Sequence, residues 1–237
     1  MHKTSQRIQK VAQAIYESRR QQEMERLDDF PFTYGKLEKT ADIIKAGDNF
    51  RTVITCWALI SEWMDAGLKY HLRFGSERQR KELFGPMGPL GTDSAKLRLL
   101  LALGWVPGST VTILDRLRKK RNLLAHSISP SDEIELSEIF NDEKSTTLKS
   151  RLSAVENASG EDGSTREKRK EVEGKALLLL LALDVLVSTV CGPSRLELGL
   201  GESSAPAFFS FDEGPEWFRE SGREFARAYL ILLGIEE

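Results

Sequence analysis

Cysteine is scarce in this chain of 237 residues: only Cys56 and Cys191 are present, each inside an apolar run and neither in a Cys-x-x-Cys pair. Two isolated thiols exclude a disulfide framework and a cysteine-ligated zinc site. They are typical of proteins kept in a reducing compartment. We therefore expect two buried free thiols in a cytoplasmic protein.

An excess of charge of one sign is also missing, since 34 basic residues nearly balance 36 acidic ones. Without a global basic field, any nucleic-acid site must be a local patch. Long hydrophobic runs are missing too. The longest, residues 176–187, contains Asp184 and is shorter than the roughly 20 residues that a bilayer-spanning helix needs. We interpret it as a buried core helix and expect no membrane contact.

Several catalytic signatures are absent: the P-loop, Gly-x-Gly-x-x-Gly, His-Glu-x-x-His and Gly-x-Ser-x-Gly. We therefore expect no cofactor and no metal. The loop Gly85–Gly91 holds three glycines and two prolines but no Lys-Ser/Thr pair for a phosphate. We interpret it as a structural turn between packed helices, with an anion at the helix start near Thr92 as the alternative.

Apolar residues recur at three- and four-residue spacing along most of the chain, and no alternating strand pattern is convincing. This periodicity is typical of amphipathic helices, whose ends are marked by Gly, Pro, Asp and Asn. The sequence predicts an all-α fold, a single compact bundle of about seven to eight helices with residues 49–73 at its centre. Further helices are expected at residues 4–27, 36–45, 94–103, 110–127, 171–190 and 216–233, with a short one ending near Phe140.

The composition changes after residue 140, because residues 157–170 are rich in Ser, Gly, Glu and Lys and hold no large hydrophobe. Such a segment is typical of a flexible linker. Irregular structure is expected from Pro193 to Pro215, held to the core by Phe208, Phe209 and Phe211. One domain therefore has four expected parts: an N-terminal amphipathic helix (1–35), a helical core (36–140), a flexible linker segment (141–170) and C-terminal helices that complete the domain (171–237).

The densest positive feature is the run at residues 116–121. On a helix its charges spread over more than half the circumference, so they cannot all be buried. A solvated basic face is the usual explanation, and contact with nucleic acid or phosphate is the alternative. The candidate nucleic-acid-binding or partner-binding residues are Arg116, Arg118, Lys119 and Lys120.

A sharper pattern follows in Arg121, Asn122 and His126. Asn122 and His126 share a helix face, whereas Arg121 and His126 lie about 140° apart around an ideal helix. The latter pair converges only if the helix end unwinds or if two copies meet across a dimer axis. A histidine that moves a proton and an arginine that stabilises phosphate charge suffice for metal-free RNA cleavage through the 2′-hydroxyl. The structural alternative is that His126 caps the helix while the other two bond neighbouring helices.

The order of Gly88-Pro89-Leu90-Gly91, Ser94-Ala95-Lys96, Arg121-Asn122 and Ala125-His126 resembles the mannitol operon repressor (MtlR-like) family over roughly residues 48–140. Members of that family are compact helical proteins with a Gly-Pro-Leu loop, a Ser-x-Lys helix and a downstream Arg-Asn/His helix. The resemblance implies a role in transcriptional control without a standard DNA-binding motif.

The stretch from Arg121 to His126 also resembles the Arg-x4–6-His motif of the HEPN superfamily, with Asn122 as the polar residue after the arginine. That superfamily contains helical, usually dimeric proteins. Many are metal-independent ribonucleases of defence or toxin systems, and others are non-catalytic nucleotide or RNA binders. One helical scaffold is compatible with both resemblances.

The resemblances imply a cytoplasmic MtlR-like regulatory protein whose working surface is centred on Arg118, Arg121, Asn122 and His126. The alternative is a HEPN-like metal-independent endoribonuclease of a defence or toxin–antitoxin system. In that case His126 is the general base or acid, Arg121 stabilises the phosphate and Asn122 is the orienting residue. The sequence leaves open whether the chain is an enzyme. Its candidate partners are a second copy of the chain, another protein and RNA.

Overall fold

The computed structural model describes residues 13–14, 17–18, 20–72, 74–126, 135–158, 165–197 and 214–235. Within these ranges the chain is helical without strands, so the all-α prediction is confirmed. The number of helices is slightly above the expected seven to eight. Residues 20–28 are helical, and the further elements are α2 (Lys36–Lys45), α3 (Asn49–His71), α4 (Glu77–Phe84), α5 (Asp93–Ala102), α6 (Gly108–His126), η1 (Leu136–Phe140), η2 (Glu143–Ser145), α7 (Thr146–Ala158), α8 (Thr165–Glu197) and α9 (Glu216–Leu233).

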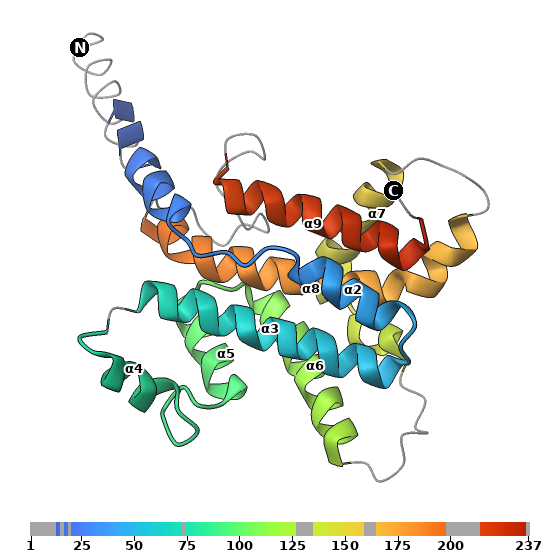
Figure 1. Cartoon of the computed structure of the whole chain (residues 1–237), viewed down its shortest axis with the longest axis horizontal. Helices are drawn as coiled ribbons and strands as arrows, with labels where there is room; N and C mark the ends of the chain where they lie inside the picture. The colour runs from blue at the N-terminus through green and yellow to red at the C-terminus, as the bar shows by residue number, and fades with distance from the viewer. Residues whose placement is uncertain are drawn as a thin grey trace.

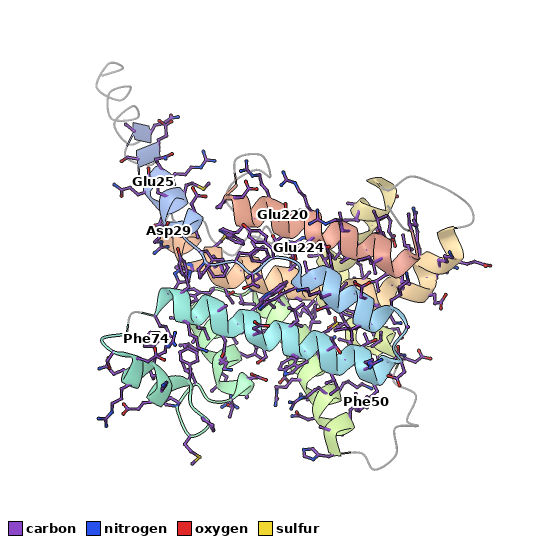
Figure 2. All side chains as sticks on the ribbon, viewed as in Figure 1. Glu25, Asp29, Phe50, Phe74, Glu220 and Glu224 are labelled. Atoms are coloured by element: carbon purple, nitrogen blue, oxygen red, sulfur yellow. The ribbon has the colours of Figure 1, made fainter. Side chains whose placement is uncertain are left out.

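Helices α3 and α8 lie side by side at the centre of the molecule (Figure 1). Helices α2 and α9 form a pair that packs on one side of them, and α5 and α6 lie against α3 on the other. One continuous hydrophobic cluster joins all of these helices, and side chains fill the space between the ribbons (Figure 2). The predicted central position of residues 49–73 is confirmed.

Asp48 caps the start of helix α3, and its carboxylate accepts a hydrogen bond from the backbone N–H of Arg51 at 2.7 Å. Asp is one of the residues favoured at this position, because its side chain satisfies an amide that has no acceptor within the helix. Further along, α3 and α8 approach closely because Gly67 has no side chain. A Cβ atom there would lie 2.4 Å from the hydroxyl oxygen of Thr189 on α8.

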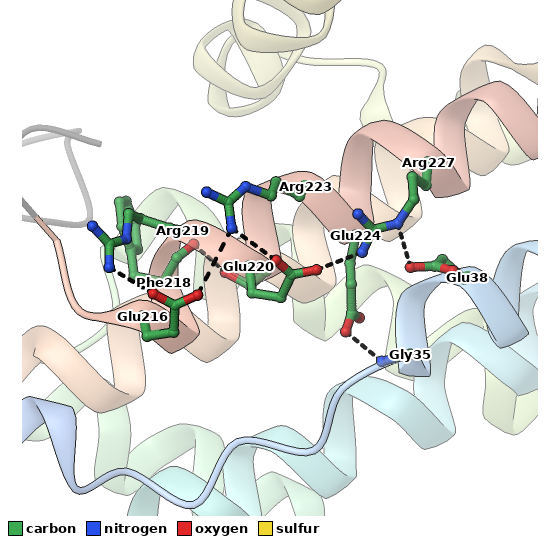
Figure 3. A network of polar contacts seen from close by, with 10 residues as sticks. Gly35, Glu38, Glu216, Phe218, Arg219, Glu220, Arg223, Glu224 and Arg227 are labelled. Carbon is green, nitrogen blue, oxygen red and sulfur yellow. Dashed lines mark hydrogen bonds and ion pairs between the residues drawn. The ribbon is translucent and has the colours of Figure 1, made fainter. Parts of the chain in front are cut away.

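The pair α2–α9 is held by a buried carboxylate. Glu224 of α9 is 1% exposed and accepts a hydrogen bond from the backbone N–H of Gly35 at the start of α2 (Figure 3). It also accepts one from the backbone N–H of Leu37. These amides have no acceptor within their own helix. Gly35 has a φ of 77°, which favours glycine, and no side-chain cap of its own. Alongside, Arg227 bridges Glu38 at 2.7 Å and Glu220 at 2.6 Å.

The start of α5 is tied to α3 by a polar cluster. Asp93 accepts hydrogen bonds from the indole N–H of Trp57 at 2.8 Å and from the hydroxyl of Ser61 at 2.7 Å. Lys96, only 6% exposed, pairs with Asp65 of α3 at 2.6 Å. The Ser-x-Lys stretch therefore places its lysine in the α3–α5 contact, where burial is tolerated because carboxylates surround the cation.

The predicted helix at 171–190 is longer than expected, because α8 runs from Thr165 to Glu197 and continues through Pro193. A proline in a helix interior cannot donate to the preceding turn and disturbs its carbonyls. In the same turn, the Nε2–H of His71 donates to the carbonyl of Val190 at 2.7 Å. By length and composition the segment Glu167–Ser194 could cross a membrane, but 89% of its most apolar window is buried inside the fold.

The flexible linker predicted at 141–170 is wrong for much of its length. Residues 143–145 form η2, residues 146–158 form α7, and α8 begins at Thr165. Leu148 and Leu152 of α7 are buried in the core with exposures of 4% and 2%. Their four-residue spacing is a helical signal that the polar composition of the segment conceals. Residues 159–164 lie outside the described residues.

Helix α4, which the sequence analysis does not predict, precedes the Gly85–Gly91 loop and is capped by Ser76. The loop amides of Gly88, Leu90 and Gly91 donate to the carbonyls of Gly85, Leu83 and Gly88. A Cβ at Gly88 or Gly91 would lie 2.2 Å from a backbone oxygen. Because the loop bonds to itself, the geometry favours the structural turn over an anion cradle. Residues 1–12, Ser129-Pro130 and the three phenylalanines Phe208, Phe209 and Phe211 lie outside the described residues.

Candidate functional site

Helix α6 carries every residue singled out by the sequence motifs. Its core side is formed by Leu114, Leu117 and Leu124, all at most 6% exposed. The first part of the helix packs against α3, α5 and the 135–145 segment, whereas its C-terminal end extends away from the bundle (Figure 1). The end of α6 is therefore an exposed platform on a rigid helix.

The cations of the basic run are mostly neutralised within the chain. Arg118 and Lys119 share Asp115, one turn earlier, at 2.6 and 2.9 Å. The Arg118 guanidinium holds the pKa of Asp115 below its usual range. Four of the five cations in the run have such partners; the other two pairs are Arg116 with Asp142 and Lys120 with Glu138.

The carboxylates of Glu138 and Asp142 come from the segment that follows α6. Arg116 lowers the pKa of the Asp142 carboxyl to about 2 by hydrogen bonding, so this carboxylate stays charged at any physiological pH. Pairing of this kind weakens the local positive potential that a nucleic-acid backbone would meet. The geometry therefore does not bring Arg116, Arg118, Lys119 and Lys120 together as a free basic face.

Arg121 differs from the rest of the run. It is half-buried, and its guanidinium donates to the side-chain oxygen of Asn122 at 3.0 Å. Within the described part of the chain no carboxylate pairs with it. An arginine held by a neutral amide keeps most of its capacity to bind an anion.

His126 is the last residue of α6 and is exposed. It makes no hydrogen bond or ion pair with the described residues, so the expected C-terminal cap is not seen among them. It lies five positions after Arg121, and on an ideal helix this places the two about 140° and roughly 7.5 Å of rise apart. Within one copy, the helix holds these side chains on different faces.

A large exposed hydrophobe lies among these polar residues. The side chain of Leu123 is 68% exposed, beside an exposed Ala125. We call the group Arg121, Asn122, Leu123, Ala125 and His126 the α6 end surface. It combines one cation without a carboxylate partner, an exposed imidazole and apolar area that water covers at a free-energy cost.

No group of three or more His, Cys, Asp or Glu residues in the described ranges could hold a metal ion. Both cysteines are buried and neither forms a disulfide, as predicted, and burial raises the pKa of Cys56 to about 12. No protein-family model matches this chain, and neither a curated protein nor a solved structure is significantly similar to it. The function is therefore argued from the residues themselves.

Sequence reasoning missed the carboxylates that neutralise the basic run. Asp115 could have been found, because it stands three residues before Arg118 and four before Lys119 on one helix. Glu138 and Asp142 are 18 and 26 residues from their partners, Lys120 and Arg116. Only the path of the chain after α6 brings these together.

Proposed function

We propose that this chain is an MtlR-like regulatory protein of the cytoplasm that acts through a partner bound at the α6 end surface. The observation that carries the proposal is the contrast along α6: the basic run is paired within the chain, while the end of the helix exposes Leu123 beside Arg121 and His126. A mixed apolar and polar patch on a rigid element suits a protein partner better than a DNA groove.

The test compares transcript levels in the host after deletion of the gene and after complementation. We expect deletion to change a discrete set of transcripts and the wild-type gene to restore them. Leu123→Asp places a charge in the exposed apolar area and should fail to restore them. Leu101→Asp is the matched control, because Leu101 is 47% exposed on α5, outside the α6 end surface. Unchanged transcripts on deletion, or full restoration by Leu123→Asp, would contradict the proposal.

A second function is favoured by one specific observation: neither Arg121 nor His126 has a charged partner among the described residues. In a HEPN-like ribonuclease, His126 would accept the proton of the RNA 2′-hydroxyl while that oxygen attacks phosphorus. The 5′-oxygen would leave with a proton taken from water, which yields a 2′,3′-cyclic phosphate and a 5′-hydroxyl. Arg121 would stabilise the added negative charge. Their separation on α6 means that the two residues would meet only across two copies.

Cleavage of a mixed RNA substrate in EDTA separates this second function from the first. A ribonuclease should cleave as the wild type, lose cleavage as His126→Ala, and keep it as Lys119→Ala. Lys119 is a suitable control because it is exposed on the same helix and paired with Asp115. Absence of cleavage by wild-type dimers would rule out the ribonuclease function.

A further inference from the structure

A small cavity of about 30 Å³ lies at the opposite end of α6, between its first turn, α7 and α8. A water molecule needs roughly 10–15 Å³ of such volume, so the space holds about two waters or one small oxyanion. Thr110 and Ser188 line it from the buried side and Lys144 from the exposed side. The cavity thus leads from the surface toward the core.

Two nearly buried residues present hydroxyl groups to the cavity. Ser188 of α8 is 2% exposed and Thr110 of α6 is 8% exposed. Neither side chain hydrogen-bonds to any residue in the described part of the chain, although both line the cavity. Buried hydroxyls are normally satisfied, so their partner is expected inside the cavity.

Positive potential converges on the same space. Helix α6 begins at Gly108 with Val111 as the first amide bonded to the preceding turn, through the carbonyl of Pro107 at 3.0 Å. The amides before it have no acceptor within the helix, and together they carry the positive end of the helix dipole. Ser109 and Thr110 of this turn line the cavity.

Two side-chain cations add to this potential. Lys144 makes no ion pair with the described residues, and Arg151 pairs with Asp184 at the cavity wall. The charge of Lys144 is therefore not neutralised by a carboxylate of the described residues. Burial raises the pKa of Asp184 to about 6, consistent with a wall that little solvent reaches.

We propose that this cavity is a binding site for a small tetrahedral oxyanion of the inorganic phosphate class. The hydroxyls of Thr110 and Ser188 and the first-turn amides of α6 donate hydrogen bonds to the anion. Lys144 supplies the charge at the entrance, and Arg151 contributes from the wall. The proposal does not depend on the function of the α6 end surface.

Calorimetric titration of inorganic phosphate into the full chain, in a buffer free of phosphate and sulfate, tests this site. Saturable binding of one anion per chain is expected. Lys144→Ala should weaken it about tenfold, the usual effect of losing one charge-assisted hydrogen bond. Thr110→Val and Ser188→Ala, which remove hydroxyls and almost no volume, should weaken it by a similar factor. Lys119→Ala removes an exposed cation elsewhere on α6 and should leave binding unchanged.

Three results would overturn the proposal. The first is the absence of saturable phosphate binding by the wild type. The second is wild-type affinity in Lys144→Ala, which would place the anion elsewhere. The third is equal weakening by Lys119→Ala and Lys144→Ala, the signature of general charge attraction. If circular dichroism shows that a hydroxyl variant does not fold, the phosphate affinity of Lys144→Ala tests the proposal without it. The Lys144 side chain is exposed and makes no ion pair with the described residues, so this variant should fold.

Discussion

Glu224 shows how one side chain joins two helices that are far apart in the sequence. Its carboxylate is buried, and burial raises its pKa, yet it receives the amides of Gly35 and Leu37. A side chain from α9 thereby replaces the cap that α2 lacks. The sequence analysis predicts both helices correctly but does not pair them, because the sequence of neither helix indicates a contact with the other.

Glu224→Ala is expected to destabilise the fold by about 2–3 kcal/mol, because it leaves buried amides without an acceptor. Glu224→Gln keeps one acceptor oxygen and should cost less. The control is Glu216→Ala on the same helix, whose side chain is 64% exposed and whose ion pairs contribute little. Urea unfolding measures all three. Equal effects of Glu224→Ala and Glu216→Ala would contradict the capping role.

Two titratable side chains, those of His71 and Asp184, give the free energy of unfolding opposite dependences on pH. Burial lowers the pKa of His71 from 6.5 to about 4, so the unfolded state binds its proton first as pH falls. His71 therefore favours the folded state above pH 6.5, and this contribution is lost as pH falls toward 4. Asp184 acts the other way: its pKa rises from 3.8 to about 6, so its contribution is lost as pH rises between these values.

Replacement of each group should separate the two effects. His71→Gln keeps a donor for Val190 and removes the titration, so its stability should fall less than that of the wild type between pH 6.5 and pH 4. Asp184→Asn should lose more than the wild type on acidification from pH 6. Thermal unfolding across this range measures both, and parallel curves for all three proteins would refute the assignment.

At the scale of elements, the helix bounds were predicted correctly where the hydrophobic periodicity and the helix-ending residues agree. Helices α2 and α9 have the predicted bounds, because glycines follow amphipathic stretches at Gly47 and Gly234. The prediction failed at α7, whose apolar stripe is confined to a few residues in a polar segment. It also ended α8 too early, at residue 190, because the Gly192-Pro193 pair is typical of a helix end, whereas the helix continues to Glu197.

The α3–α8 contact should be sensitive to a single added methyl group. Gly67→Ala would set a Cβ 2.4 Å from the hydroxyl of Thr189, so we expect a loss of about 1–3 kcal/mol. Gly108→Ala is the matched control, because a Cβ there meets nothing within 4 Å. It should be neutral or stabilising by up to about 1 kcal/mol. Denaturant unfolding of the two variants compares them, and equal stabilities would contradict the close approach.

At the scale of the whole molecule, the N-terminal part of α6 packs within the bundle and its C-terminal end is exposed. The motif residues Arg121, Asn122 and His126 could be chosen from the sequence, since the resemblance depends on their order alone. Their surroundings could not. The carboxylates that pair with Arg116 and Lys120 come from the 135–145 segment, whose position along α6 the motif does not indicate.

The most direct measurement for the proposed function compares His126→Ala with Leu123→Asp in the complemented deletion strain, by transcript profile. A regulator that works through partner contact should be disabled by Leu123→Asp and nearly unaffected by His126→Ala, which removes only an imidazole from the contact. The account predicts that the Leu123→Asp profile matches the deletion and the His126→Ala profile matches the wild type. The reverse outcome, with His126→Ala matching the deletion and Leu123→Asp the wild type, would contradict it and favour the ribonuclease.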